Sequence, residues 1–322
     1  MNFDFSDDLK MLREQARKFL AGRCSRQVVR KVFEGGAGYD AELWAEIARM
    51  GWLGTAVPEP YGGSGVGYDG LCLLAEELGY VLAPVPFSSS IYLAAEAIMI
   101  AGSEAQKQKL LPPMIDGGRI GTVALAEGMG NPSPKHIKAK VASGHLTGTK
   151  MPVPDGEIAH FALVAARDEA DDIGVYADDI GVYVVELSGK GVARTRLKGI
   201  DPARNQAKIV FDGAPAERLE GARGYAIIDE LIDRAAILMA FEQVGGAQAC
   251  LDMAKAYAVD RYAFGRPIAA FQAIKHKLAD VYVAIELARS NAYYGAWAIT
   301  AGAAELPVAG AAARVAATDA FH

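Results

Sequence analysis

Apolar side chains recur at intervals of three and four residues near the start of the chain, and this spacing predicts a helix. Ser6 is a suitable N-cap for that helix, and Asp7 and Asp8 suit its first turn, where negative charge is favourable. The apolar positions of the predicted helix are Leu9, Leu12, Ala16, Phe19 and Leu20.

Helical patterns then recur over 41–51, 68–80 and 89–117. Gly51 is a natural C′ residue, so the first of these helices is predicted to end there. The stretch 51–70 is too rich in Gly and Pro for a helix and is predicted to be an ordered loop. Pro112 and Pro113 are predicted to end the third helical run. Residues 1–118 should therefore form an N-terminal α-helical domain.

The pattern changes over residues 119–214, where short apolar or alternating runs are separated by Gly, Asp, Ser and Pro. This is typical of strands and predicts a middle β-domain, a small barrel or sandwich. A tandem duplication, "DDIGVYA" followed by "DDIGVYV", lies at 171–184. It is too short for a repeat architecture, so we interpret it as a lengthened hairpin or loop.

Residues 215–322 return to helical spacing. One helix of about 34 residues, or roughly 50 Å, is predicted to reach residue 262. A second is predicted from near Ile268 to about Gly302, and a third starts near residue 306. Three long antiparallel helices need a fourth to close a bundle, so we expect an incomplete four-helix bundle, truncated at its C-terminus. The fold class is multi-domain α+β.

The composition narrows the class of protein. The chain has 322 residues, of which 52% are hydrophobic and 22% charged, as in an ordinary globular protein. The net charge of −6 argues against a general nucleic-acid binder. The three cysteines are far apart and form no CxxC, so we expect neither disulfides nor a metal site. We predict a cytoplasmic protein, since no secretory leader or membrane span is evident.

The stretch "DRYAFGRPIAAFQAIKHKLAD", residues 260–280, interrupts the long helical pattern with chemically distinctive groups. Arg261 carries a permanent charge on a planar fork that suits a pyrophosphate. Phe264 can lie against an aromatic ring, and Gln272, about one turn into the following helix, can form hydrogen bonds with a dinucleotide. Taken alone, the stretch also fits a helix hairpin with a solvated Arg and a core Phe.

Three stretches of the chain resemble the acyl-CoA dehydrogenase family. They are "GWLGTAVPEPYGGSG", "GSEAQKQKLLPPMIDG" leading into "GTVALAEG", and "AYAVDRYAFGRPIAAFQAIKHKLADVYVAIELAR". The resemblance covers the whole chain and implies the same helical, β and helical domain order. It also implies that Arg261, Phe264 and Gln272 reach FAD bound in a neighbouring subunit, that the substrate is an acyl-CoA, and that an electron-transferring flavoprotein accepts the electrons.

The chain departs from the family pattern where the β-domain normally contacts flavin. The family's "TEPGAGSD"-like turn reads "AEGMGNPS" here, with Ala126 in place of the Thr and Pro132 in place of the Ser. Pro152 stands where the family has a Trp, and Pro154 where it has a hydroxyl residue. Proline offers neither a hydroxyl nor an amide hydrogen. These changes indicate that the chain's own flavin pocket is degraded.

The catalytic base is not identified from the sequence. In most of the family the base is a glutamate whose counterpart would lie beyond residue 322, and in a minority it precedes an Arg on the first bundle helix. Ungapped alignment places Ala235 there, with Asp233 as a weaker candidate and Glu242 expected to pack at the bundle edge or pair with a cation. For His276, a core or interface hydrogen bond is favoured over proton transfer.

We therefore predict an FAD-dependent acyl-CoA dehydrogenase, in which this chain is the flavin-arm subunit of a heteromer. Two alternatives remain open: a self-sufficient homotetrameric dehydrogenase that holds FAD through backbone amides, and a non-catalytic structural subunit. Oxidase chemistry and the identity of the acyl group are not readable from the sequence.

Overall fold

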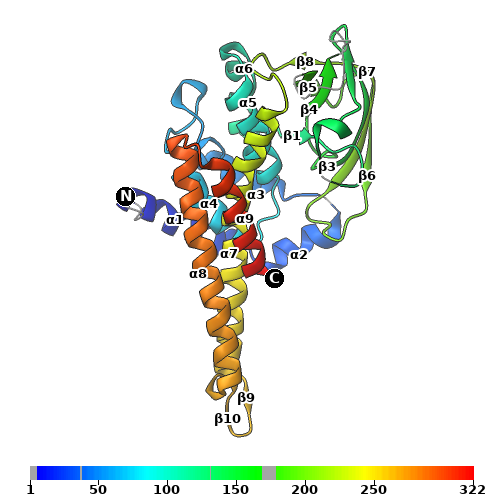
Figure 1. Cartoon of the computed structure of the whole chain (residues 1–322). Coiled ribbons are helices and arrows are strands. Elements are labelled where there is room, and N and C mark those ends of the chain that lie inside the picture. The colour runs from blue at the N-terminus through cyan, green and yellow to red at the C-terminus, as the bar shows by residue number, and fades with distance from the viewer. Residues whose placement is uncertain (1–5, 37, 131, 169–178) are drawn as a thin grey trace. The chain divides into compact units, whose positions relative to one another are not determined.

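The computed structural model describes residues 6–36, 38–130, 132–168 and 179–322 (Figure 1). The residue contacts divide the chain into two compact units. The first comprises residues 1–27, 66–83 and 233–322, and the second comprises residues 28–65 and 84–232. The three domain boundaries expected from the sequence remain predictions.

The predicted helix boundaries near the N-terminus are confirmed. The helices of this region are α1 (Asp7–Arg23), α2 (Arg26–Gly35), α3 (Ala41–Arg49) and α4 (Tyr68–Tyr80). The side chain of Ser6 caps α1 by accepting a hydrogen bond from the amide of Leu9. Gly51 follows α3 with φ of +76°, a left-handed conformation that favours glycine at a helix end. The pattern did not indicate α2 as a separate helix.

The run 89–117 is not one helix. It contains a π-helix (Ser88–Ala95), α5 (Glu96–Ala101) and α6 (Glu104–Ile115), and Ser103 opens α6 with a capping box completed by Gln106. The prediction that Pro112 and Pro113 end the run is wrong, since both lie inside α6. They lack amide hydrogens, but their carbonyls still accept hydrogen bonds from Asp116 and Arg119 at the helix end.

A buried cluster of charges holds the helices of the first unit together. Glu76 and Glu77 of α4 are 2% and 1% exposed. Arg13 donates to both carboxylates, at 2.8 Å from Glu76 and 3.0 Å from Glu77. Arg17 also bonds Glu77, and Arg289 of α8 (Gln272–Ala301) lies 3.3 Å from Glu76. Every buried carboxylate here has a guanidinium partner, which offsets the cost of removing the charges from water.

The long helix α7 (Ala226–Asp260) crosses α4 at two glycines. A methyl group on Gly79 would lie 2.0 Å from the carbonyl oxygen of Glu242, and one on Gly245 would lie 1.9 Å from the carbonyl oxygen of Glu76. Backbone therefore meets backbone at this crossing, and only glycine fits on either side.

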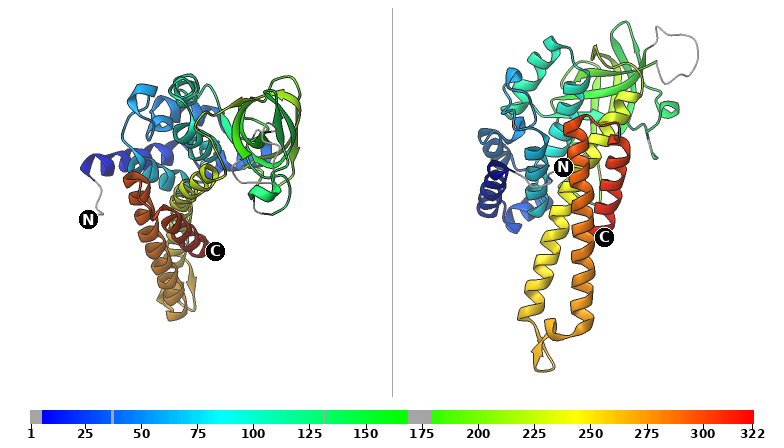
Figure 2. Two further views of the ribbon diagram at one scale, coloured as in Figure 1. Left: turned by 45° about the horizontal axis from the view of Figure 1, so that its top comes forward. Right: turned by 60° about the vertical axis from the view of Figure 1, so that its left-hand side comes forward.

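The second unit contains a sheet that curls toward a barrel (Figure 2). Its strands are β1 (Gly121–Ala124), β2 (Lys140–Ala142), β3 (His145–Pro154), β4 (Phe161–Asp168), β5 (Ile180–Glu186), β6 (Val192–Leu197), β7 (Gln206–Pro215) and β8 (Glu217–Arg218). Among the described residues their order is β6-β7-β3-β2-β4-β5-β8, with β1 parallel to β4. The predicted β-domain is confirmed. The first copy of the tandem duplication lies outside the described residues, and the second enters β5.

Helices α8 (Gln272–Ala301) and α9 (Leu306–Phe321) run beside α7 (Figure 1). Small residues permit the contacts: a methyl group on Gly295 of α8 would lie 2.8 Å from Ile237, and one on Gly310 of α9 would lie 3.0 Å from the carbonyl oxygen of Asp233. The expected start of the second long helix near Ile268 is wrong. Residues Ile268–Ala270 form one 3₁₀ turn, and α8 begins at Gln272.

Within the part of the chain that the structure describes, no helix is both long and apolar enough to cross a membrane. Cys24, Cys72 and Cys250 are all free thiols. The cytoplasmic location stays a prediction.

Candidate functional site

The three residues singled out for cofactor contact lie together on the connection between α7 and α8, which we call the arm (residues 261–272). Arg261 follows the last residue of α7, and Gln272 is the first residue of α8 rather than one turn inside it. Between them β9 (Tyr262–Ala263) and β10 (Arg266–Pro267) pair as a short hairpin. The hairpin extends beyond the ends of the two helices (Figure 1).

The side chains of the arm are available to a partner or ligand. Phe264 is 95% exposed at the hairpin tip, and Arg261 and Gln272 are also exposed. The core position that a plain helix hairpin would give Phe264 is therefore excluded. The backbone of Arg261 closes the hairpin, because its carbonyl accepts a hydrogen bond of 2.8 Å from the amide of Ile268. Among the residues that the structure describes, none pairs with the guanidinium of Arg261, so it is available to an anion.

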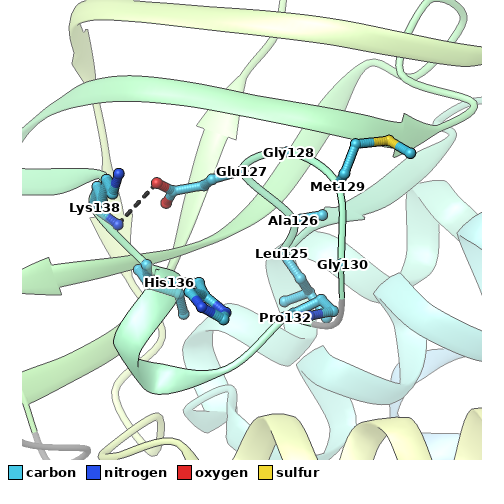
Figure 3. A pocket seen from close by; sticks show the side chains of 10 residues that line it. Leu125, Ala126, Glu127, Gly128, Met129, Gly130, Pro132, His136 and Lys138 are labelled. Atoms are coloured by element: carbon cyan, nitrogen blue, oxygen red, sulfur yellow. Dashed lines mark hydrogen bonds between the residues drawn. The ribbon is translucent and has the colours of Figure 1, made fainter.

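A second candidate region is the turn after β1 in the β-domain. Leu125–Gly130, with Pro132 and His136–Lys138, line a cavity of about 120 Å³ (Figure 3). Met129 at the head of the turn is fully exposed. Gly128 and Gly130 on either side of it have φ of +142° and +109°, which only glycine adopts readily.

A buried ion pair between Lys150 and Glu127 anchors this turn to strand β3. Lys150 of β3 is 0% exposed, and its ammonium lies 2.7 Å from the Glu127 carboxylate and 3.1 Å from the Leu125 carbonyl. Glu127 also accepts hydrogen bonds from the amides of Lys138 and Ala139, at 2.8 Å and 3.0 Å. Burial lowers the pKa of Lys150 to about 8, while Glu127 opposes that shift. The Glu127 carboxylate thus connects the turn with strand β3 and with the segment that contains Lys138 and Ala139.

The residues present at this turn do not fit a flavin. Ala126, Pro132 and Pro154 supply no hydroxyl, and Pro154 supplies no amide hydrogen. Two amides of the region are already engaged within the chain. Gly128 donates to the Met151 carbonyl at 2.9 Å, and Met151 donates to the Ala126 carbonyl at 2.8 Å. In the described part of the turn, the side-chain hydroxyls that could hold a flavin ring are missing, and two of the backbone amides are occupied.

Comparison with known proteins identifies the chain's relatives. The model of the acyl-CoA dehydrogenase N-terminal domain matches residues 6–118, and that of the C-terminal domain matches residues 222–322. The mitochondrial isovaleryl-CoA dehydrogenase of Solanum tuberosum is 31% identical over 79% of this chain.

The chain belongs to the acyl-CoA dehydrogenase family.

Two solved structures of this acyl-CoA dehydrogenase fold are similar over nearly the whole chain. The Tcur3481-Tcur3483 steroid ACAD is 32% identical with a TM-score of 0.86, over 98% of this chain and 84% of that one. The ChsE4-ChsE5 complex from Mycobacterium tuberculosis is 28% identical with a TM-score of 0.87, over 99% and 85%. The chain spans 64% of the length of the Solanum tuberosum relative. Members of this family normally bind FAD.

Among the described residues, no side chain can be assigned as the catalytic base of an acyl-CoA dehydrogenase. Ala235, at the position a helix glutamate takes in some members, is buried and apolar. Asp233 is half-buried and remains an untested candidate. Glu242 faces Arg314, whose pKa is lowered by burial and raised in turn by that carboxylate, which agrees with the expected pairing to a cation. His276 is exposed, so a core role is excluded and an interface role stays open.

Sequence reasoning missed the hairpin of the arm and the ion pair under the turn. The hairpin has no Asn-Gly or Asp-Gly signal, because its two-residue loop is Phe264-Gly265. The ion pair did leave a signal. Lys150 lies four residues after the buried Leu146. Side chains alternate between the two faces of a strand, so both residues point to the buried face of β3.

Removal of Lys150 alone is expected to destabilise the second unit strongly. Lys150→Met leaves the Glu127 carboxylate buried without its cation, which costs about 3–5 kcal/mol of unfolding free energy. Lys150→Met with Glu127→Gln removes both charges and keeps one acceptor oxygen, so one of the two amides of Lys138 and Ala139 retains its partner. The double variant should therefore recover part of the loss, as measured by urea denaturation of all three proteins at pH 7.

The same pair gives a pH dependence of known sign. The folded pKa of Lys150, about 8, lies below its unfolded value of about 10.4. Between these values the unfolded chain binds more protons, so unfolding free energy rises with pH. Relative to the double variant, the wild-type protein should gain stability from pH 8 to pH 10. A wild-type protein that loses stability relative to the double variant over this range would contradict the lowered pKa of Lys150.

Proposed function

We propose that this chain is a subunit of an FAD-dependent acyl-CoA dehydrogenase and that its arm completes the flavin site of a different subunit. The observation that carries the proposal is the contrast between the two candidate regions. The arm is exposed and carries the charge and ring that suit a flavin dinucleotide, while the chain's own β-domain turn lacks the family's hydroxyl side chains and has two of its amides engaged within the chain.

The reaction would remove a proton from the α-carbon of an acyl-CoA thioester and a hydride from the β-carbon, leaving an α,β-double bond. When bound, FAD supplies the hydride acceptor. Arg261 would neutralise the pyrophosphate through charge-assisted hydrogen bonds. Phe264 would cover an aromatic face of the cofactor and exclude water from it. Gln272 would donate or accept a hydrogen bond at the dinucleotide.

The relatives support an assembly of unlike subunits. Both the Tcur3481-Tcur3483 steroid ACAD and the ChsE4-ChsE5 complex carry two component names. A tetramer with a second acyl-CoA dehydrogenase subunit, a bulky acyl-CoA such as a steroid side-chain thioester, and an electron-transferring flavoprotein as acceptor are the corresponding partners. We propose a cytoplasmic location for this assembly.

A flavin spectrum of the purified protein tests the proposal. The chain is purified alone and after co-expression with a second acyl-CoA dehydrogenase subunit, and absorbance near 450 nm is compared with the subunit ratio. We expect no flavin on the lone chain and about one FAD per two subunits in the complex. About one FAD per subunit on the lone chain would instead support a self-sufficient homotetramer. A colourless complex that still assembles would support a purely structural subunit.

A further inference from the structure

The loop at the tip of the arm has a costly backbone conformation for the residue it carries. Ala263 pairs with Arg266 and Tyr262 with Pro267, which leaves Phe264 and Gly265 as a two-residue loop. Both have positive φ, +54° and +76°, as in the type I′ turn that suits a twisted hairpin. Gly265 adopts this conformation freely, but a bulky aromatic residue at positive φ is an outlier, and Asn or Asp is the usual occupant of that position.

Burial does not explain why Phe264 occupies this position. Its side chain is 95% exposed, so the ring gains almost nothing from the hydrophobic effect in this chain. A strained backbone that carries an exposed aromatic ring is typical of a site at which the strain serves a contact made elsewhere.

The ring of Phe264 contacts the ring of Phe271. Their centroids are 6.3 Å apart and their planes meet at 84°, an edge-to-face arrangement. The guanidinium of Arg266 lies 4.3 Å from the Phe271 centroid, within cation–π range. Arg266 forms no ion pair with any residue that the structure describes, so its charged head is engaged by the Phe271 ring.

We propose that Arg266 is a positioning residue: through Phe271 it fixes the orientation of the Phe264 ring, which the strained turn presents to the flavin of the neighbouring subunit. This inference rests on the proposed function for the identity of the flavin. The turn and the three side chains belong to this chain alone, so the arrangement can be tested without a cofactor.

The strain is tested on the lone chain by amide hydrogen exchange. The amide of Ile268 closes the hairpin onto the Arg261 carbonyl, so its exchange reports hairpin opening. Phe264→Asn places a residue suited to positive φ in the turn and should slow this exchange about tenfold. Phe264→Ala removes the ring but keeps the unfavourable φ, so it serves as the matched control and should not slow exchange. Unchanged or faster exchange in Phe264→Asn would contradict the claim that Phe264 strains the turn.

The support by Arg266 is tested with a fluorinated phenylalanine at position 264. In the lone chain, Arg266→Met should move the ¹⁹F resonance toward that of the free amino acid, while Arg266→Lys, which keeps a cation over Phe271, should leave it near the wild-type position. Equal spectra for the wild-type chain and Arg266→Met would overturn the positioning role.

The link to the cofactor is tested on the assembled complex by fluorescence titration with FAD. Arg266→Met should weaken FAD binding about threefold, and Arg266→Lys should restore it. Phe264→Asn should weaken binding about tenfold. If Phe264→Asn weakens binding and Arg266→Met does not, the positioning role fails and the proposed function stands. If neither variant changes FAD binding, although exchange in Phe264→Asn is slowed, the ring does not serve the flavin and the inference is overturned.

Discussion

Gly245→Ala is expected to unfold the first unit or reduce its stability severely. The added methyl group would lie 1.9 Å from the Glu76 carbonyl oxygen and 2.9 Å from the Tyr80 amide nitrogen. Both are backbone atoms of α4, so no side-chain rotation can relieve the overlap. The helices must separate, and the expected loss of unfolding free energy is at least about 3 kcal/mol.

Separation of α4 from α7 would also disturb groups that depend on the crossing. Glu76 and Glu77 lie on α4, buried and paired with three arginines. Phe241 and Val244 of α7 are fully buried near the same point. Movement at Gly245 therefore loosens the apolar packing. It also disturbs the ion pairs of Glu76 and Glu77, whose close geometry offsets the cost of burying their charges.

Gly22→Ala is the matched control. Gly22 lies near the end of α1, with no atom within 4 Å of the position its methyl group would take. Alanine there should stabilise the helix by about 0.5–1 kcal/mol, because glycine loses more backbone entropy on folding. Thermal unfolding of both variants, followed by circular dichroism, checks the opposite signs. Wild-type stability in Gly245→Ala would contradict the close crossing of α4 and α7.

The sequence predicted most helices because their apolar periodicity and caps are local. Ser6, Gly51 and the 68–80 pattern each indicate an element within a few residues of chain. The prediction from Pro112 and Pro113 was wrong because it, too, considered only the local sequence. The rule that proline ends a helix describes the lost amide. Helix α6 nevertheless continues for two residues beyond Pro113, and the carbonyls of both prolines accept hydrogen bonds.

The candidate site was predicted less completely, because its parts are joined by contacts that spacing does not record. The roles of Arg261, Phe264 and Gln272 came from a resemblance, and the structure adds that all three are exposed on one connection. The engagement of the Gly128 and Met151 amides depends on strand β3 lying beside the turn. The stacking of Arg266 on Phe271 depends on a hairpin whose loop lacks the usual turn residues.

Arg261→Met is expected to cause the largest loss of cofactor in the assembled complex. A charge-assisted hydrogen bond from a guanidinium to a phosphate contributes about 1.5–3 kcal/mol, which corresponds to a tenfold to hundredfold weaker FAD affinity. The substitution keeps the backbone carbonyl that accepts from Ile268, so the hairpin should remain closed.

Two further variants separate the possible causes of that loss. Arg261→Lys keeps the charge but loses the planar fork, so its FAD affinity should lie between those of the wild-type protein and Arg261→Met. Arg30→Met removes the same charge from an exposed i,i+4 pair with Glu34 on α2, which contributes little to stability, and it should leave FAD binding unchanged. Equilibrium dialysis of each complex against FAD, with the subunit ratio measured in parallel, gives the affinities. Equal loss in Arg261→Met and Arg30→Met would indicate a general effect of net charge. Full retention of FAD in Arg261→Met would contradict the assignment of Arg261 to the flavin site.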